Sequence, residues 1–280
     1  MQNKKAESSR PVSNDLRDGA AASPLPVRLV SAGAFMLLAT VALVLPVPAS
    51  LHVKLASGLV LSAGCLVFLT GGSRLLAPAV FLVLAYFFRC LPFYSFFLML
   101  AVPLALYGLL VWRVPAFHHG RRGFAMGRAE RLPFIVTIVI TAISVAGLVA
   151  WYFIGDADFS GFTDSFSDRS TVAVILGGLA FSVVNVFVSE TVFRGVLWQG
   201  LEECLAAALP VVLIQGLLYG ASHYWGAVPN GWEGAILSGV YGLLLGFIRF
   251  SSRGIFLPMV SHLCVDFTLL ALVLHSLGRF

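Results

Sequence analysis

The chain has 280 residues, 59% of them hydrophobic and only 11% charged, with a formal net charge of +5. This composition excludes an ordinary soluble globular domain, in which about a quarter of the residues are charged. No nucleic-acid partner is indicated, because the lysines and arginines lie in short stretches between apolar runs, which is typical of a membrane protein. The expected surroundings of most of the chain are therefore a lipid bilayer.

The N-terminal stretch, residues 1–25, is polar and carries charges of both signs, which predicts a disordered tail on the cytoplasmic side. The first apolar run, Val27 to Val47, is longer than the core of a signal peptide and is followed by no clear small-x-small cleavage site. We expect this run to remain in the protein as a membrane helix.

Further apolar runs near the roughly 20 residues needed to cross a bilayer recur along the chain. Backbone groups in lipid must be paired within the protein, and the sequence lacks the alternating strands of about ten residues that form a barrel. The sequence therefore predicts an all-α, polytopic transmembrane bundle of about eight or nine helices. The runs are Leu51–Thr70, Leu75–Phe88, Leu91–Trp112, Leu132–Ile154, Val172–Trp198, Leu205–Ser222, Gly234–Phe250 and Ile255–Leu277.

Charges in the loops predict how the bundle is oriented. Residues 113–131 carry five arginines against the single acid Glu130, which places this loop, and with it the N-terminus, in the cytoplasm. Residues 155–168 carry four aspartates and no basic residue, as expected on the outer side. We therefore divide the chain into the tail at 1–25, N-terminal membrane helices with the basic loop at 26–131, and a C-terminal bundle at 132–280.

Three pairs of side chains stand four residues apart within the last spans: Glu190 with Arg194, Tyr219 with His223, and His262 with Asp266. Residues at this spacing share one face of a helix. A charge within a membrane span costs at least ~2.5 kcal/mol, so such residues usually pair inside the bundle or line a water-filled site. We expect the ionisable members to share one polar site, although an ion pair that only fixes helix register is the alternative for the first pair.

The segments SETVFRG, LLYGASHYWG and GIFLPMVSHLCVDF follow one another in this order in the C-terminal bundle. Together they resemble the motifs of the CPBP family of intramembrane proteases, which includes the CAAX prenyl endopeptidases and the Abi proteins of bacteriocin processing and self-immunity. The resemblance covers about residues 170–277. It implies a catalytic site made of Glu190, Arg194, His223, His262 and Asp266, with Tyr219 in place of the usual phenylalanine.

The resemblance also implies a mechanism and partners. Glu190 and His223 would activate a water molecule, and His262 and Asp266 would stabilise the oxyanion, without metal or cofactor. A zinc site is an alternative, but the sequence has no HExxH and its four cysteines lack ligand spacing. The implied partners are the lipid bilayer and a membrane-associated protein or peptide substrate, in a bacterial cytoplasmic (inner) membrane with the N-terminus inside.

Ser189 departs from the family pattern, because it stands where the first glutamate of a Glu-Glu-x-x-x-Arg motif is expected. Neighbouring residues on a helix point about 100° apart, so Glu190 takes that direction only after a rotation or a local distortion. Either Glu190 is the base, or the site is inactive as a protease, or Ser189 contributes in another way. A scaffold, sensor or immunity factor is therefore the alternative function, and a transporter or channel is a third.

Depth in the membrane sets a further condition on a shared site. The loop charges place Glu190 near the cytoplasmic end of its span and His223 near the opposite end of the next. A tilted or extended sixth helix would bring them to one level.

Overall fold

The computed structural model describes residues 25–70, 74–91, 96–155, 157, 159, 163, 166–205, 207–225 and 229–279. Every regular element in these residues is helical, which confirms the predicted all-α fold. The predicted tail up to residue 24 lies outside the described residues, as do three of the four aspartates of the acidic stretch, Asp156, Asp158 and Asp164.

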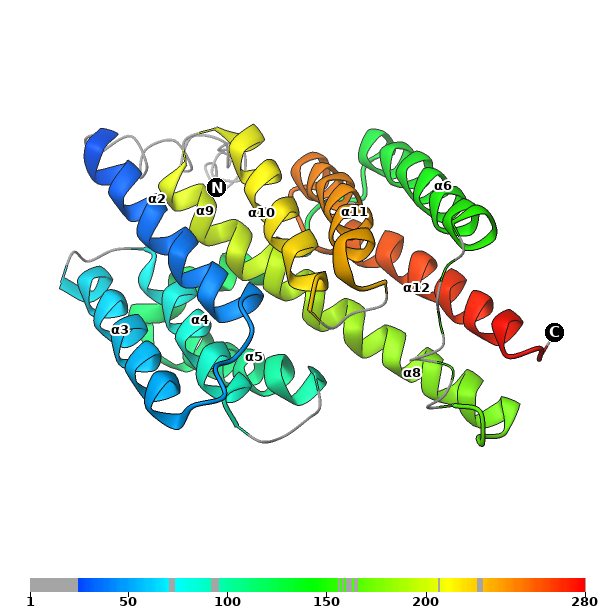
Figure 1. Ribbon diagram of the computed structural model, residues 1–280. Coiled ribbons are helices and arrows are strands. Elements are labelled where there is room, and N and C mark those ends of the chain that lie inside the picture. Colours follow the sequence, from blue (N-terminus) through cyan, green and yellow to red (C-terminus); the bar gives the residue numbers. More distant parts are fainter. Residues whose placement is uncertain are drawn as a thin grey trace, which may run out of the picture.

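The N-terminal helices gather on one side of the molecule (Figure 1). They are α2 (Leu25–Ala39) with a π-helical continuation η1 (Thr40–Val44), α3 (Leu51–Thr70), α4 (Leu76–Arg89) and α5 (Phe96–Arg113). The shortness of α4 matches the short apolar run in the sequence. Arg89, in its last turn, donates hydrogen bonds to the carbonyls of Ala42 at 2.6 Å and Leu45 at 2.9 Å, which ties the end of α4 to the end of η1.

One continuous helix of 34 residues, Thr171–Cys204, runs through the centre of the molecule. It consists of α8 (Thr171–Glu190), the π-helical η3 (Thr191–Leu197) and α9 (Trp198–Cys204). At 1.5 Å per residue its length is on the order of 50 Å, against ~30 Å for the hydrocarbon core of a bilayer. Glu190 therefore lies well inside an extended helix. Such a helix is one of the two arrangements expected to bring Glu190 and His223 to the same level.

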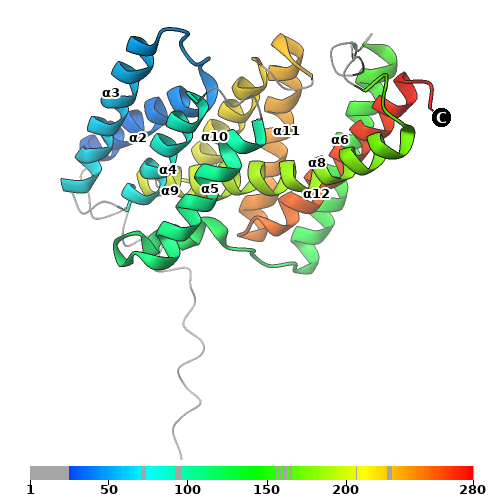
Figure 2. The same cartoon turned by 90° about the horizontal axis from the view of Figure 1, so that it is seen from below.

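The C-terminal helices lie on the side of the molecule away from α3 (Figure 2). They are α6 (Arg131–Ile154), α10 (Ala208–His223), α11 (Gly231–Ser252) and α12 (Phe256–Ser276). α10 and α11 pack side by side, and α12 packs against both α6 and α8. This packing brings the three motif-bearing helices together.

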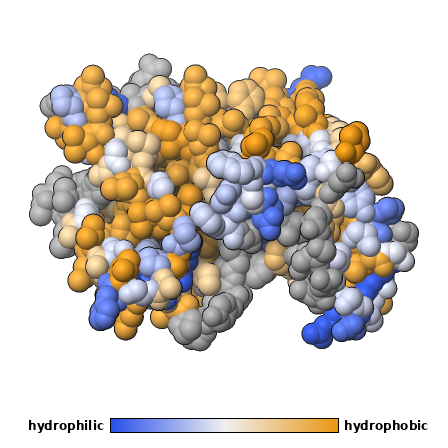
Figure 3. Space-filling model, in the orientation of Figure 1, coloured by the Kyte–Doolittle hydropathy of each residue, from blue (hydrophilic) through white to orange (hydrophobic). Residues whose placement is uncertain are grey.

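Apolar side chains cover much of the surface seen in Figure 3. At the two ends of α6, Leu132 is 71% and Ile154 is 83% exposed. Among the described residues, 5 helices are long and apolar enough to cross a membrane, and α3, α4, α5 and α10 contain shorter apolar helices. So much exposed apolar surface, over helices of this length, suits lipid rather than water. The protein is an integral membrane protein.

The basic loop contains a helix that the sequence did not predict. Residues Pro115–Phe124 form a 3₁₀ helix, η2, which packs against the central helix. The side-chain amide of Gln199 donates to the carbonyl of His119 at 3.0 Å, and Nε2 of His119 lies 2.6 Å from Oε1 of Glu203. The arginine-rich composition of this segment is typical of a solvated loop, but contacts with the central helix and with α5 give it a fixed shape.

At Gly195 the central helix approaches the backbone of η2 closely. A Cβ atom there would collide with the backbone carbonyl oxygen of Gly123, which has no flexible side chain to move aside. Gly195→Ala is therefore expected to destabilise the protein by about 1–3 kcal/mol, a usual cost of overpacking. The measurement is the midpoint of thermal unfolding in detergent micelles.

Gly177 provides the matched control, because it lies in the same continuous helix and a Cβ there meets nothing within 4 Å. Gly177→Ala should leave the midpoint unchanged or slightly higher, since alanine suits a helix better than glycine. Equal midpoints for the two variants would contradict the close approach of η2.

Candidate active site

The central helix changes its hydrogen-bonding pattern directly after Glu190. The seven residues of η3, Thr191–Leu197, are π-helical. The hydroxyl of Thr191 donates to the carbonyl of Phe187 at 2.7 Å, a side-chain bond that competes with the backbone ladder. A π-helical turn uses i→i+5 bonds and so takes up one residue more than an α-helical turn, often at functional sites. This is a local distortion of the kind that would let Glu190 change direction.

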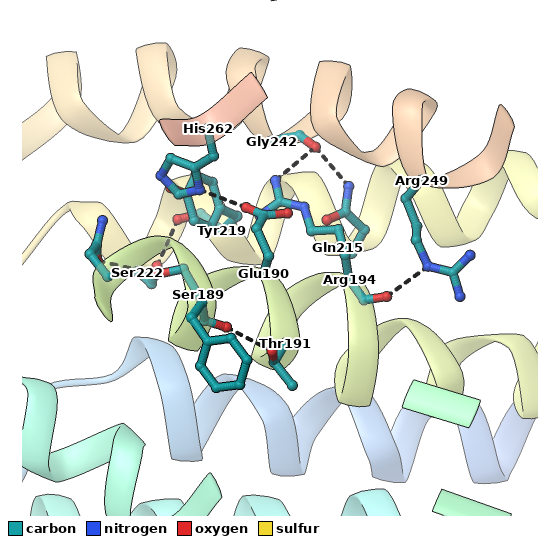
Figure 4. Close-up of polar contacts among 12 residues, drawn as sticks. Ser189, Glu190, Thr191, Arg194, Gln215, Tyr219, Ser222, Gly242, Arg249 and His262 are labelled. Carbon is teal, nitrogen blue, oxygen red and sulfur yellow. Dashed lines mark hydrogen bonds and ion pairs between the residues drawn. The ribbon is translucent and has the colours of Figure 1, made fainter. Parts of the chain in front are cut away.

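Glu190 and Arg194 form an ion pair in which neither side chain is exposed. Nη1 of Arg194 donates to Oε1 of Glu190 at 3.0 Å, which confirms the contact predicted from their spacing. Nδ1 of His262 lies 2.7 Å from the same oxygen, and it must be the donor because an ionised carboxylate only accepts. Figure 4 shows the imidazole of α12 and the guanidinium of η3 meeting at this carboxylate. Two motifs 72 residues apart thus share one acceptor oxygen.

Further contacts hold Arg194 in place (Figure 4). Its Nη2 donates to the carbonyl of Gly242 on α11 at 3.2 Å, and Gln215 on α10 donates to the same carbonyl at 2.8 Å. The guanidinium carbon lies 4.5 Å from the centroid of the Tyr219 ring, a cation–π distance. These contacts join η3, α10 and α11 around a permanent positive charge beside Glu190.

Asp266 approaches the other ring nitrogen of His262. Its Oδ1 is 3.5 Å from Nε2, and the hydroxyl of Tyr219 is also 3.5 Å from Nε2. Both separations exceed the usual range of a good hydrogen bond. Oδ2 of Asp266 is bound more firmly, since it accepts from the amide of Asn185 at 2.9 Å. His262 therefore has a carboxylate near each ring nitrogen, one tight and one loose.

Ser189 is buried and belongs to the same polar network. Its hydroxyl donates to Oδ1 of Asn185 at 3.3 Å, and Asn185 in turn binds Asp266. Ser189, which stands where the family pattern has a glutamate, is therefore connected to Asp266 on α12 by hydrogen bonds through the amide of Asn185. No carboxylate comes from Ser189 itself.

His223 is the last residue of α10 and contacts the cluster from the side of Tyr219. Its Nδ1 donates to the carbonyl of Tyr219 at 2.9 Å, which leaves Nε2 as an acceptor in the neutral ring. The ring of Tyr219 lies between the two histidines, 4.6 Å from the His223 centroid and 6.3 Å from that of His262. Among the contacts of the described residues, none joins His223 to Glu190, so the pairing implied by the family pattern is not formed in this structure.

Sequence reasoning missed three residues that position the cluster: Asn185, Gln215 and Gly242. Asn185 stands four residues before Ser189, so its amide on the same helix face was a usable signal. Gln215 is a polar residue within an apolar run and could have been found in the same way. Gly242 contributes only its main-chain carbonyl, for which a side-chain pattern gives no signal.

A structural zinc site needs four ligands, and a catalytic one needs at least three from the protein. In the part of the chain that the structure describes, no three histidine, cysteine, aspartate or glutamate side chains are grouped in a way that could hold a metal ion. The described residues thus offer the zinc alternative no ligand set.

Comparisons with known proteins bear on this same segment. Residues 169–268 match a protein-family model described as type II CAAX prenyl endopeptidase Rce1-like. No curated protein and no solved structure gives a match. The matched segment contains all three motifs and the residues of the polar cluster. Over these residues the match supports the resemblance to the CPBP family of intramembrane proteases that the motifs indicated.

Proposed function

We propose that the protein is an intramembrane endopeptidase that hydrolyses a peptide bond of a membrane-associated protein or peptide. One observation carries the proposal: the contacts that link Arg194, Glu190 and His262 from two helices of the family-matched segment. An ion pair that only fixed helix register would need no imidazole bound to its carboxylate. An imidazole held at one nitrogen and loosely contacted at the other is suited to proton transfer or oxyanion binding.

Within this proposal, the role of Glu190 is to orient His262. Its Oε1 accepts hydrogen bonds from Nδ1 of the imidazole and from Arg194. Arg194 holds the carboxylate in place, and the carboxylate in turn sets the orientation of the His262 ring. Nε2 then points to the region of Asp266 and the hydroxyl of Tyr219. A hydrogen on Nε2 can bind the oxyanion that forms when water attacks the peptide carbonyl.

His223 has a different role, since its Nδ1 is occupied by a backbone carbonyl. Its Nε2 is left to accept a hydrogen bond from the attacking water, as in a neutral ring. The sequence pattern grouped His223 with Glu190, whereas the contacts support Glu190 as the partner of His262. We therefore assign His223 to positioning the water and His262 to the developing negative charge.

The substrate class follows from the location of the cluster and from the family. A site on membrane helices receives substrates that are themselves held at the membrane. The matched family is described as prenyl endopeptidases, which makes a prenylated peptide the first substrate to test. A prenyl chain would partition into the bilayer around the apolar surface of the bundle.

The test uses the full-length protein in liposomes and a farnesylated peptide with a fluorophore and a quencher on either side of the bond after the modified cysteine. We expect the wild type to release fluorescence, and His223→Ala to lower kcat by about 100-fold, because misplacing a reacting group by ~1 Å can cost about 10²-fold. His52→Ala is the matched control, since His52 lies on α3, outside the cluster. Equal rates for wild type and His223→Ala would contradict the assigned role of His223.

A further inference from the structure

The cluster contains two carboxylates, and their surroundings differ. Glu190 is fully buried, and its Oε1 already accepts from Arg194 and His262. Its other oxygen, Oε2, is buried with no hydrogen-bond partner, so a water would reach it only after the packing opened. A general base must be within hydrogen-bonding reach of the water it deprotonates. Glu190 is poorly placed for that role.

Asp266 is placed better. Its side chain is 12% exposed, whereas that of His262 is 3% exposed and that of Glu190 is not exposed at all. Its Oδ1 has only the loose 3.5 Å approach to His262, which leaves this oxygen free to accept a hydrogen from water. It also lies beside the Nε2 atom to which oxyanion binding is assigned above.

Asn185 and Ser189 complete the arrangement from α8. The amide of Asn185 donates to Oδ2 of Asp266 at 2.9 Å, and the hydroxyl of Ser189 donates to the carbonyl oxygen of that amide at 3.3 Å. The hydroxyl fixes which way the amide is turned, and the amide fixes the carboxylate. A glutamate at position 189 would place a second negative charge in this network, and like charges in one buried site disfavour each other.

From these contacts we infer that Asp266, on α12, is the general base of the site and that Asn185 and Ser189 are its positioning residues. The inference rests on the proposed endopeptidase function. Oδ1 takes one proton from the water as the oxygen forms a bond to the peptide carbonyl carbon, and the carbonyl oxygen becomes the oxyanion. The oxyanion then reforms the carbonyl as the C–N bond breaks, and the proton on Asp266 passes to the leaving amine nitrogen. The carboxylate of Asp266 is thus restored.

Substituting Asp266 with asparagine tests this role sharply, because it changes the chemistry of the side chain more than its shape. The asparagine side chain would keep the size and much of the polar contact of the native side chain but could not take a proton. In the liposome assay with the quenched farnesylated peptide, Asp266→Asn is expected to lower kcat by about 100-fold or more. Asp266→Glu keeps the carboxylate and should retain measurably more activity than Asp266→Asn.

A second experiment moves the carboxylate from position 266 to position 189 and tests whether activity is recovered. Ser189→Glu in the Asp266→Asn background returns a carboxylate to the same network from the other helix while keeping its total charge. We expect this double variant to recover at least about tenfold in kcat over Asp266→Asn, out of the 10²–10⁴-fold that a general base contributes. Thermal unfolding midpoints in detergent identify any variant that fails to fold. If Asp266→Asn or the double variant does not fold, the kcat of Asp266→Glu relative to the wild type tests whether the carboxylate is the base.

The outcomes separate this inference from the proposed function. If Asp266→Asn keeps kcat within about threefold of wild type, against the 10²–10⁴-fold expected for a base, Asp266 serves the oxyanion or the fold and the inference is wrong. If the wild type is inactive and Ser189→Glu alone is active, the architecture is that of a protease whose native chain lacks a base, which also overturns the inference. If neither cleaves the farnesylated peptide, the proposed action on prenylated peptides fails, and the assignment of Asp266 falls with it.

Discussion

Replacing Arg194 with methionine is expected to lower the free energy of unfolding by about 3–5 kcal/mol, the cost of removing one partner from a buried ion pair. The variant would leave the carboxylate of Glu190 in a site with no exposure and with only His262 as a donor. It would also remove a donor to the carbonyl of Gly242 and the cation over the ring of Tyr219. The measurement is denaturant-induced unfolding in mixed micelles.

A double variant separates the unpaired charge from lost packing. Glu190→Gln combined with Arg194→Met removes both charges at similar side-chain volume, and it should recover a large part of the lost stability. Arg113→Met is the matched control, because Arg113 is exposed at the end of α5, and its effect should stay within about 0.5 kcal/mol. A loss in Arg194→Met no greater than in this control would mean that the pair does not stabilise the bundle.

The helices were predictable because a bilayer imposes their length and their apolar character. The run Leu132–Ile154 became α6, Arg131–Ile154, and the pair Glu190 and Arg194 met at the predicted spacing. Both predictions depend only on local periodicity, which a sequence displays directly.

The contacts between helices could not be predicted in the same way. Spacing along one helix does not say that His262 reaches Glu190, 72 residues away, because that depends on how α8 and α12 pack. The π-helical turn of η3 was equally hidden. It combines the side-chain bond of Thr191 with the close approach of Gly195 to η2, and each alone is a common feature of α-helices.

The central helix explains why motif residues from different depths can form one cluster. Because Thr171–Cys204 is longer than a bilayer is thick, Glu190 lies inside it rather than at its end. The end of α10, with Tyr219 and His223, then reaches the same level as the carboxylate. The distortion after Glu190 turns that carboxylate toward α12, and position 189 is left facing Asn185. Ser189 is thus a member of the network that binds Asp266.

Replacing His262 with alanine is expected to lower kcat for the farnesylated peptide by about 10²–10³-fold, because removing one oxyanion-stabilising donor costs this much in other hydrolases. The loss should appear in kcat rather than in KM, since the negative charge develops only in the transition state. His275→Ala is the matched control: His275 lies on the same helix, but its Nδ1 contacts the hydroxyl of Tyr152 at 2.8 Å, outside the cluster. Its kcat should remain close to that of the wild type. If His262→Ala raised KM and left kcat unchanged, the imidazole would bind the substrate in its ground state, and the oxyanion role would be wrong.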